Sequence, residues 1–160
     1  MSLTGDAELI EFVRSRLAGT VADACALDEV LAKSLRYFQC VVGTIHRLNS
    51  TTQMLELVCH RGVPDAIMDR VRVIPIGKGM AGLAAERREA VQVCNLQTDD
   101  SGKAKPGAKL TEMQGSIAAP ILVGEALRGT IGVAMPRPHE FSVEEQQLLL
   151  RIGAIIGESW

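Results

Sequence analysis

The sequence predicts an α+β fold: a five- or six-stranded, mainly antiparallel sheet with the terminal helices on one of its faces. Two observations support this prediction. Both ends of the chain carry amphipathic helix patterns, and the segments between them are rich in β-forming residues and joined by short turns. Strands joined by short turns pair antiparallel, and the apolar stripe of a helix has to be buried against such a sheet. The 160 residues match the usual size of one domain.

Two helices are expected before the first strand. Between residues 6 and 24, apolar side chains recur at the three- and four-residue spacing of one helix face. They are Ile10, Val13, Leu17, Val21 and Ala24. Gly19 weakens this helix by roughly 1 kcal/mol relative to Ala, so a break at Gly19 is an alternative. Asp28 is expected to be the N-cap of the second helix.

The first two strands are predicted to form a hairpin. Residues 40–48 are rich in β-branched side chains, and residues 54–60 alternate between core-facing and outward positions. Residues 49–52, Asn-Ser-Thr-Thr, are typical of a turn. Residues 64–71 are expected to form a short helix.

A helix at residues 80–87 and a short strand at 91–94 are predicted to follow. The strongest strand patterns are at residues 115–123 and 127–135, which are joined through Gly124 and Glu125. These two strands are therefore expected to pair as a second hairpin.

The C-terminal helix has the clearest pattern. Ser142 and Glu145 form a capping box, in which each side chain accepts a hydrogen bond from the other residue's free backbone N–H. An apolar stripe follows and consists of Leu148, Leu149, Ile152, Ile155 and Ile156.

The composition argues against several classes of function. The net charge is −2 and aromatic residues make up 3%, which does not suit a nucleic-acid-binding surface. The longest apolar runs, such as residues 117–123, are far shorter than the ~20 residues of a membrane span. The chain does not open with a signal-peptide pattern. The four cysteines lack zinc-site spacing. Without a signal peptide they are expected to be reduced thiols in a cytoplasmic protein, with Cys25 and Cys40 in the core.

Four segments resemble the sequence signature of the GAF domain family, over about residues 27–158. IPIGKGMAGLAA at 74–85 resembles the family's hydrophobic-P-x-G-x-G-x-x-G-x-x-A motif, and AAPI at 118–121 resembles its x-V-P-L strand. LRGTIGV at 127–133 and FSVEE at 141–145 resemble its next strand and the start of its last helix. We therefore expect residues 1–160 to form a single GAF-like domain, with an N-terminal helix within 1–26 and a GAF core at 27–158.

The resemblance implies a six-stranded sheet in a sandwich-like arrangement, with loops and short helices closing a pocket on the face opposite the terminal helices. Family members bind cyclic nucleotides, tetrapyrroles, 2-oxo acids or other metabolites, often as dimers. We therefore expect a sensory or regulatory small-molecule-binding domain in signal transduction, without enzymatic activity, that acts through a homodimer or a partner protein. The alternative is a dimerisation module without a ligand, whose terminal helices meet their copies in a second chain. No membrane or nucleic-acid partner is expected, and the sequence assigns no cofactor.

The polar segment at residues 95–114 is the predicted binding loop. A connection of this length in a compact domain is typically a binding loop or a mobile one. Polar groups at its mouth directly follow the strand at 91–94, where they can converge on a ligand. An exposed loop without a ligand is the alternative. The candidate ligand contacts are Cys94, Gln97, Thr98, Asp99, Met113 and Ser116.

The glycines at 77, 79 and 82 allow two interpretations. A glycine-rich turn before a helix can bind phosphate, or it can simply require backbone freedom. Lys78 directly follows the first glycine, which does not match the phosphate-loop spacing. We favour the structural turn.

Thiol redox chemistry at Cys59 or Cys94 is a less favoured alternative. A reactive thiol needs a positive group nearby, which His60 or Arg61 could supply to Cys59; buried structural thiols are the preferred interpretation. One branch of the GAF family reduces free methionine sulfoxide. The sequence departs from that branch because Ala81 stands where its G-x-C-G-T-A motif has the cysteine. No spacing of His, Cys, Asp or Glu indicates a metal site.

Overall fold

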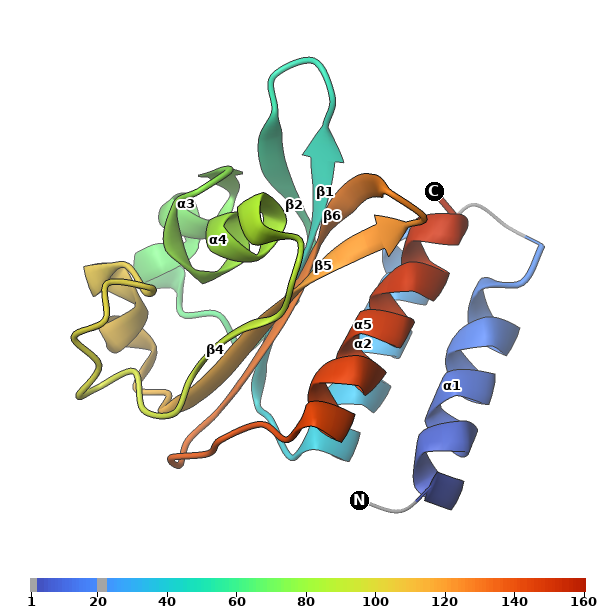
Figure 1. Cartoon of the computed structure of the whole chain (residues 1–160), viewed down its shortest axis with the longest axis horizontal. Helices are drawn as coiled ribbons and strands as arrows, with labels where there is room; N and C mark the ends of the chain where they lie inside the picture. Colours follow the sequence, from blue (N-terminus) through green and yellow to red (C-terminus); the bar gives the residue numbers. More distant parts are fainter. Residues whose placement is uncertain (1–2, 20–22) are drawn as a thin grey trace.

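The computed structural model describes residues 3–19 and 23–160, and its centre is one six-stranded sheet with helices on both faces (Figure 1). All neighbouring strands pair antiparallel, in the order β3-β2-β1-β6-β5-β4. This arrangement confirms the predicted α+β class. The strands are β1 (Val42–Asn49), β2 (Met54–Arg61), β3 (Val73–Pro75), β4 (Val91–Val93), β5 (Gly115–Val123) and β6 (Ala126–Met135).

Three long helices cover one face of the sheet in two layers. Helices α2 (Ala24–Phe38) and α5 (Val143–Glu158) pack on the strands, and α1 (Leu3–Leu17) packs on α2 and α5 from outside (Figure 1). Fully buried side chains fill this side, among them Val13, Val30, Leu31, Leu149 and Ile152. The apolar stripes of both terminal helices are thus buried within one chain. In the described residues, no helix combines the length and apolar character needed to cross a membrane.

The boundary between the first two helices differs from the sequence prediction. Helix α1 ends at Leu17, and Gly19 has φ +70°, a backbone conformation that favours glycine; Val21 lies outside the described residues. The N-cap of α2 is Asp23, whose carboxylate accepts a hydrogen bond from Ala26 N at 2.7 Å. The predicted cap, Asp28, is wrong because α2 begins five residues earlier than that prediction requires. Asp28 instead forms an ion pair with Arg61.

The shorter elements follow the predictions more closely. The β1–β2 hairpin forms, and the Asn49 side chain holds its turn by accepting hydrogen bonds from Thr51 N and Thr52 N. The helix expected at residues 64–71 is a 3₁₀ turn, η1 (Asp65–Ile67), followed by α3 (Met68–Val71). Helix α4 (Gly79–Arg87) starts one residue before its predicted position, and the capping box of α5 is present in both directions.

Candidate functional site

The two faces of the sheet carry side chains of different size. Strand residues under the helical layer are large and fully buried, such as Ile45, Ile117 and Ile131. On the opposite face, the same three strands carry small residues: Thr44, Ser116, Ala118, Gly132 and Ala134. Small side chains leave room between this face and the elements above it. A cavity of about 190 Å³ lies there.

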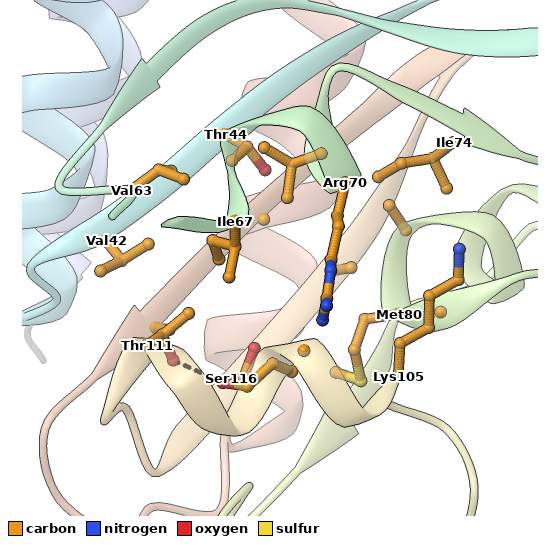
Figure 2. A pocket seen from close by; sticks show the side chains of 18 of the residues that line it. Val42, Thr44, Val63, Ile67, Arg70, Ile74, Met80, Lys105, Thr111 and Ser116 are labelled. Atoms are coloured by element: carbon orange, nitrogen blue, oxygen red, sulfur yellow. Dashed lines mark hydrogen bonds between the residues drawn. The ribbon is translucent and has the colours of Figure 1, made fainter. Parts of the chain in front are cut away.

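The walls of the cavity come from the short elements that cover this face. Val63, Ile67, Val71 and Ile74 line it from the region of η1, α3 and β3, and Met80 and Ala81 line it from α4. A second 3₁₀ segment, η2 (Pro106–Thr111), closes it with Gly107, Ala108 and Thr111. Figure 2 shows Arg70 reaching from α3 across the space between Ile67 and Met80. The lining is therefore mostly apolar.

All charged residues that line the cavity are cations. They are Arg70, Lys78 and Lys105, and no carboxylate belongs to the lining formed by the described residues. Gly107 permits the position of Arg70, because a Cβ on Gly107 would lie only 2.6 Å from Arg70 Nη1. Lys105 packs its aliphatic stem near Gly79, whose Cβ would lie 3.5 Å from Lys105 Cγ. Within residues 3–19 and 23–160, none of the three cations forms an ion pair.

The turn before α4 presents the start of that helix to the cavity. Gly77 and Gly79 have φ +89° and +68°, and a Cβ on Gly82 would lie 2.5 Å from Pro75 O. These values agree with the structural turn that the sequence favoured. Lys78 is the N-cap residue but makes no side-chain capping bond. The first N–H groups of α4 therefore have neither an intrahelical acceptor nor a capping side chain, and Lys78 to Ala81 all line the cavity.

Among the described residues His46 is the one imidazole in the lining, and only 1% of it is exposed. Its Nε2 is 2.7 Å from Val71 O. Because a carbonyl oxygen only accepts, Nε2 carries the proton and Nδ1 of the neutral ring is an acceptor. Burial lowers the pKa of His46, which keeps the ring neutral at pH 7. His46 Nδ1 and Thr130 Oγ1, on cross-strand partners, have no hydrogen-bond partner within the described chain.

Of the six residues predicted to contact a ligand, Ser116 lines the cavity. The other five do not belong to its lining, and Cys94 and Thr98 are exposed. Asp99 accepts a hydrogen bond from Ser101 Oγ at 2.8 Å, close to its own backbone. At the start of the loop the structure thus places the apolar Leu96 in the cavity wall, and the predicted polar residues Gln97, Thr98 and Asp99 outside it.

Besides Leu96, the predicted binding loop reaches the cavity through its second half. Gln97 braces the loop, since its Nε2 donates to Met113 O at 2.8 Å and to Lys109 O at 3.2 Å. This brace brings two of the predicted residues, Gln97 and Met113, together. Lys105, with Gly107, Ala108 and Thr111 of η2, then lines the cavity (Figure 2).

The sequence interpretation missed two polar residues of the cavity lining, His46 and Arg70. A signal for His46 was present in the sequence. The residue before it, Ile45, is a core residue, so the polar His46 lies on the opposite, cavity-facing side of the strand. Arg70 carried no such signal, because an arginine on a four-residue helix has the sequence appearance of a solvated charge.

The burial of the four cysteines differs in part from the prediction. Cys25 and Cys94 are exposed, whereas Cys40 and Cys59 are buried. Cys25 was expected in the core, but α2 starts at Ala24 and buries its face through Ala26 and Leu27, which leaves Cys25 outside. Burial, reinforced by the carboxylate of Asp28, raises the pKa of Cys59 to about 11. The described residues contain no cluster of three or more His, Cys, Asp or Glu side chains suited to a metal ion.

Comparisons with known proteins agree with this architecture. The sequence profile described as "GAF domain" matches residues 26–159, while among curated protein sequences none matches the chain. The fold is similar to the GAF domain of a phosphoenolpyruvate-protein phosphotransferase from Acinetobacter, with a TM-score of 0.80 and 17% identity, covering 99% of this chain and 94% of that chain.

Two further solved structures are similar in fold. A free methionine-R-sulfoxide reductase from Neisseria meningitidis, solved with its substrate, has a TM-score of 0.80 and 16% identity, covering 99% of this chain and 91% of that chain. The nlh2 GAF domain of A. aeolicus in an inactive state has a TM-score of 0.73 and 23% identity, covering 98% and 95%. At these identities the likeness concerns the fold.

Proposed function

Because the chain belongs to the GAF domain family, we propose that it is a sensory or regulatory domain that binds a small molecule in the cavity between β1, β5, β6 and the elements η2, α3 and α4. The observation that supports this proposal is the cavity of about 190 Å³ over strands whose other face is fully packed. Protein interiors hold few voids larger than a water molecule. A dry apolar cavity of about 150 Å³ takes up benzene, so this one suits a ligand of about six to nine non-hydrogen atoms.

The ligand would act on the helical layer through β5. Ser116 faces the cavity, and the residues on the other side of the same strand pack under α5, where a Cβ on Gly153 would lie 3.3 Å from Ile121. A ligand shifts a partner only by its difference in affinity between two states, typically ~1–3 kcal/mol.

We propose that the recipient of this signal is a partner protein or a second copy of the chain. Since the apolar stripes of α1 and α5 are buried internally, that contact would use their outward faces. This favours a ligand-binding domain over a dimerisation module that needs those stripes.

We further propose that the domain binds its ligand without catalysis and acts in the cytoplasm. The lining of the cavity, as far as the chain is described, has no cysteine and no carboxylate to serve as nucleophile or general acid. Arg61, the cation next to Cys59, is engaged by Asp28 through two contacts of 2.8 Å. All four cysteines are free, as suits a reducing compartment.

A metabolite thermal-shift screen tests the binding function. A ligand at about a hundred times its Kd stabilises a protein by about 2.7 kcal/mol, which raises the Tm of a domain of this size by about 5–11 °C. Ser116→Leu adds bulk inside the cavity and is expected to abolish the shift. Thr98→Ala changes an exposed loop residue outside the lining and should leave the shift intact. The proposal is refuted if no metabolite raises the Tm, or if Ser116→Leu responds like the unmodified protein.

A further inference from the structure

We infer that the cavity takes a small monocarboxylic acid, an organic anion with one carboxylate at the mouth and an uncharged, apolar body inside. This inference rests on the proposed binding function and names the chemical class of the ligand. Two independent observations lead to it: a set of cations without counter-charges at the mouth of the cavity, and an inner lining that is apolar and uncharged.

The mouth of the cavity is positively charged. Arg70, Lys78 and Lys105 belong to the lining and are all exposed to solvent, so they mark its outer end. In the described residues none of them has an ion-pair partner. Glu86 places its carboxylate near Gly77, but Glu86 lies outside the lining and pairs with none of these cations. An anionic group at the mouth would therefore gain charge-assisted hydrogen bonds without displacing an existing partner.

Arg70 extends over the cavity and depends on a glycine for its position. Figure 2 shows its side chain reaching from α3 into the space between Ile67 and Met80. A Cβ on Gly107 would lie 2.6 Å from Arg70 Nη1 and 3.2 Å from Arg70 Cδ, so a larger residue at this position of η2 would push the guanidinium aside. The planar guanidinium matches a carboxylate, to which it can donate two parallel hydrogen bonds.

The start of α4 adds backbone donors at the same end. The residues from Lys78 to Ala81 line the cavity, and Lys78 makes no side-chain capping bond. The first N–H groups of a helix carry a partial positive charge and bind anions. Lys105 packs beside this helix start, since a Cβ on Gly79 would lie 3.5 Å from Lys105 Cγ. The helix start therefore reinforces the positive charge of the side chains.

The inner part of the lining offers nothing to a second charged group. Ile67, Leu96 and Ala118 line the cavity and are buried. Because burial lowers the pKa of His46, its ring carries no charge at pH 7. A second carboxylate on the ligand would be buried here without a partner, which is strongly unfavourable. The ammonium of an amino acid would instead lie beside the carboxylate, among the three cations and without an acid in the described lining to pair with.

The size of the cavity favours a carboxylate over a phosphate. A volume of about 190 Å³ suits a ligand of about six to nine non-hydrogen atoms. A phosphate group would use more than half of those atoms and leave too few to fill the apolar lining. A carboxylate leaves enough atoms for a branched aliphatic chain or an aromatic ring.

Calorimetric titration with matched compounds tests the inference. 4-Methylpentanoate is expected to bind about tenfold to a hundredfold more tightly than 4-methylpentan-1-ol, which lacks the charge. It should also bind more tightly than leucine and hexanedioate, which carry a further charge, and than 3-methylbutyl phosphate, which has the larger headgroup. Acetate lacks the apolar body and should bind about a hundredfold more weakly. Benzoate and benzyl alcohol repeat the comparison with an aromatic body.

At least one of the two acids is expected to bind more tightly than its alcohol. Equal binding of acid and alcohol in both pairs would overturn the inference. So would binding of acetate as tight as that of the larger acids, or a preference for leucine, the diacid or the phosphate.

Two variants and one matched control locate the carboxylate. Arg70→Gln is expected to weaken the acid by about tenfold to a hundredfold without affecting the alcohol, whereas a general loss of structure would weaken both. Arg72→Gln is the control, because Arg72 is a neighbouring cation outside the lining that pairs with Asp69 instead. Gly107→Ala should displace the guanidinium and weaken the acid, but should add nothing when combined with Arg70→Gln. Lys105→Gln repeats the charge test if Arg70→Gln lowers the Tm of the free protein.

The outcomes separate this inference from the proposed function. Binding of the alcohols alone, or a thermal-shift screen that identifies only neutral or cationic metabolites, would leave a small-molecule site but refute the selection of an acid. An unchanged acid-to-alcohol ratio in both Arg70→Gln and Lys105→Gln would refute the role of the cations. Failure of all the compounds together with an empty metabolite screen would refute the binding function itself.

Discussion

Two glycines three residues apart on β6 are expected to respond in opposite directions to the same added methyl group. A Cβ on Gly129 would lie 2.0 Å from His46 O and 3.1 Å from Arg47 Cα, both backbone atoms of the neighbouring strand β1. A backbone cannot move away by changing a rotamer. Because ordinary contact begins at 3.4 Å, the strands would have to separate by about 1.4 Å at this point. Such overpacking costs about 1–3 kcal/mol, and we expect Gly129→Ala to lie at the upper end.

Gly132 has room for an added methyl group instead. Its Cβ would meet Thr44 Oγ1 at 3.4 Å and Ile117 O at 3.6 Å, which are ordinary contacts at the floor of the cavity. Glycine within a strand is less stable than alanine by roughly 0.5–1 kcal/mol, because it has more conformational freedom to lose. Gly132→Ala is therefore expected to stabilise the protein by about that amount, a rise in Tm of about 1–4 °C.

Urea denaturation followed by circular dichroism measures the difference directly. The free energies of unfolding of Gly129→Ala and Gly132→Ala should differ by about 3–4 kcal/mol, with equal m-values if both unfold in two states. If Gly129→Ala is as stable as the unmodified protein, or if Gly132→Ala is the less stable of the pair, the packing described for β1 and β6 is incorrect.

Three further predictions concern the thiols, the buried imidazole and the last helix. In the native protein, iodoacetamide at neutral pH should label exposed Cys94 well before Cys59, whose pKa burial raises to about 11; equal rates by mass spectrometry would contradict this. Burial lowers the pKa of His46 below its ordinary 6.5, so below pH 6.5 the unfolded chain binds a proton that the folded chain does not. Stability should therefore be complete above pH 6.5 and fall as the pH is lowered, and His46→Gln should show a smaller fall in urea denaturations from pH 8 to 5. Ser142→Ala should lower the free energy of unfolding by about 1 kcal/mol and Ser142→Gly by only a few tenths; equal losses would exclude capping as the cause.

Local patterns in the sequence were sufficient for most of the fold. The capping box of Ser142 and Glu145, the stripe of α5 and the turn at Asn49 all form as predicted. These features depend on residues within a few positions of one another, whose hydrogen bonds and spacing are independent of distant packing. The motif at 74–85 similarly predicted the turn before α4, because positive φ at Gly77 and Gly79 is a local property.

Where two local patterns competed, tertiary packing decided between them. Asp23 and Asp28 are both suitable caps by residue type; in the folded chain α2 packs against β1 and β2 with Asp23 as its cap. The same choice of helix start turns Cys25 away from the core.

The candidate site depended on tertiary structure almost entirely. His46 on β1, Arg70 on α3 and Lys105 before η2 are far apart in sequence and converge only when the chain folds. Period-two alternation shows that a strand has two faces, but it cannot show that one face stays partly uncovered. A small residue such as Gly132 does not reveal in the sequence whether another side chain fills the space above it. The cavity is therefore a property of how the covering elements fit over the sheet, and local periodicity carries no record of that fit.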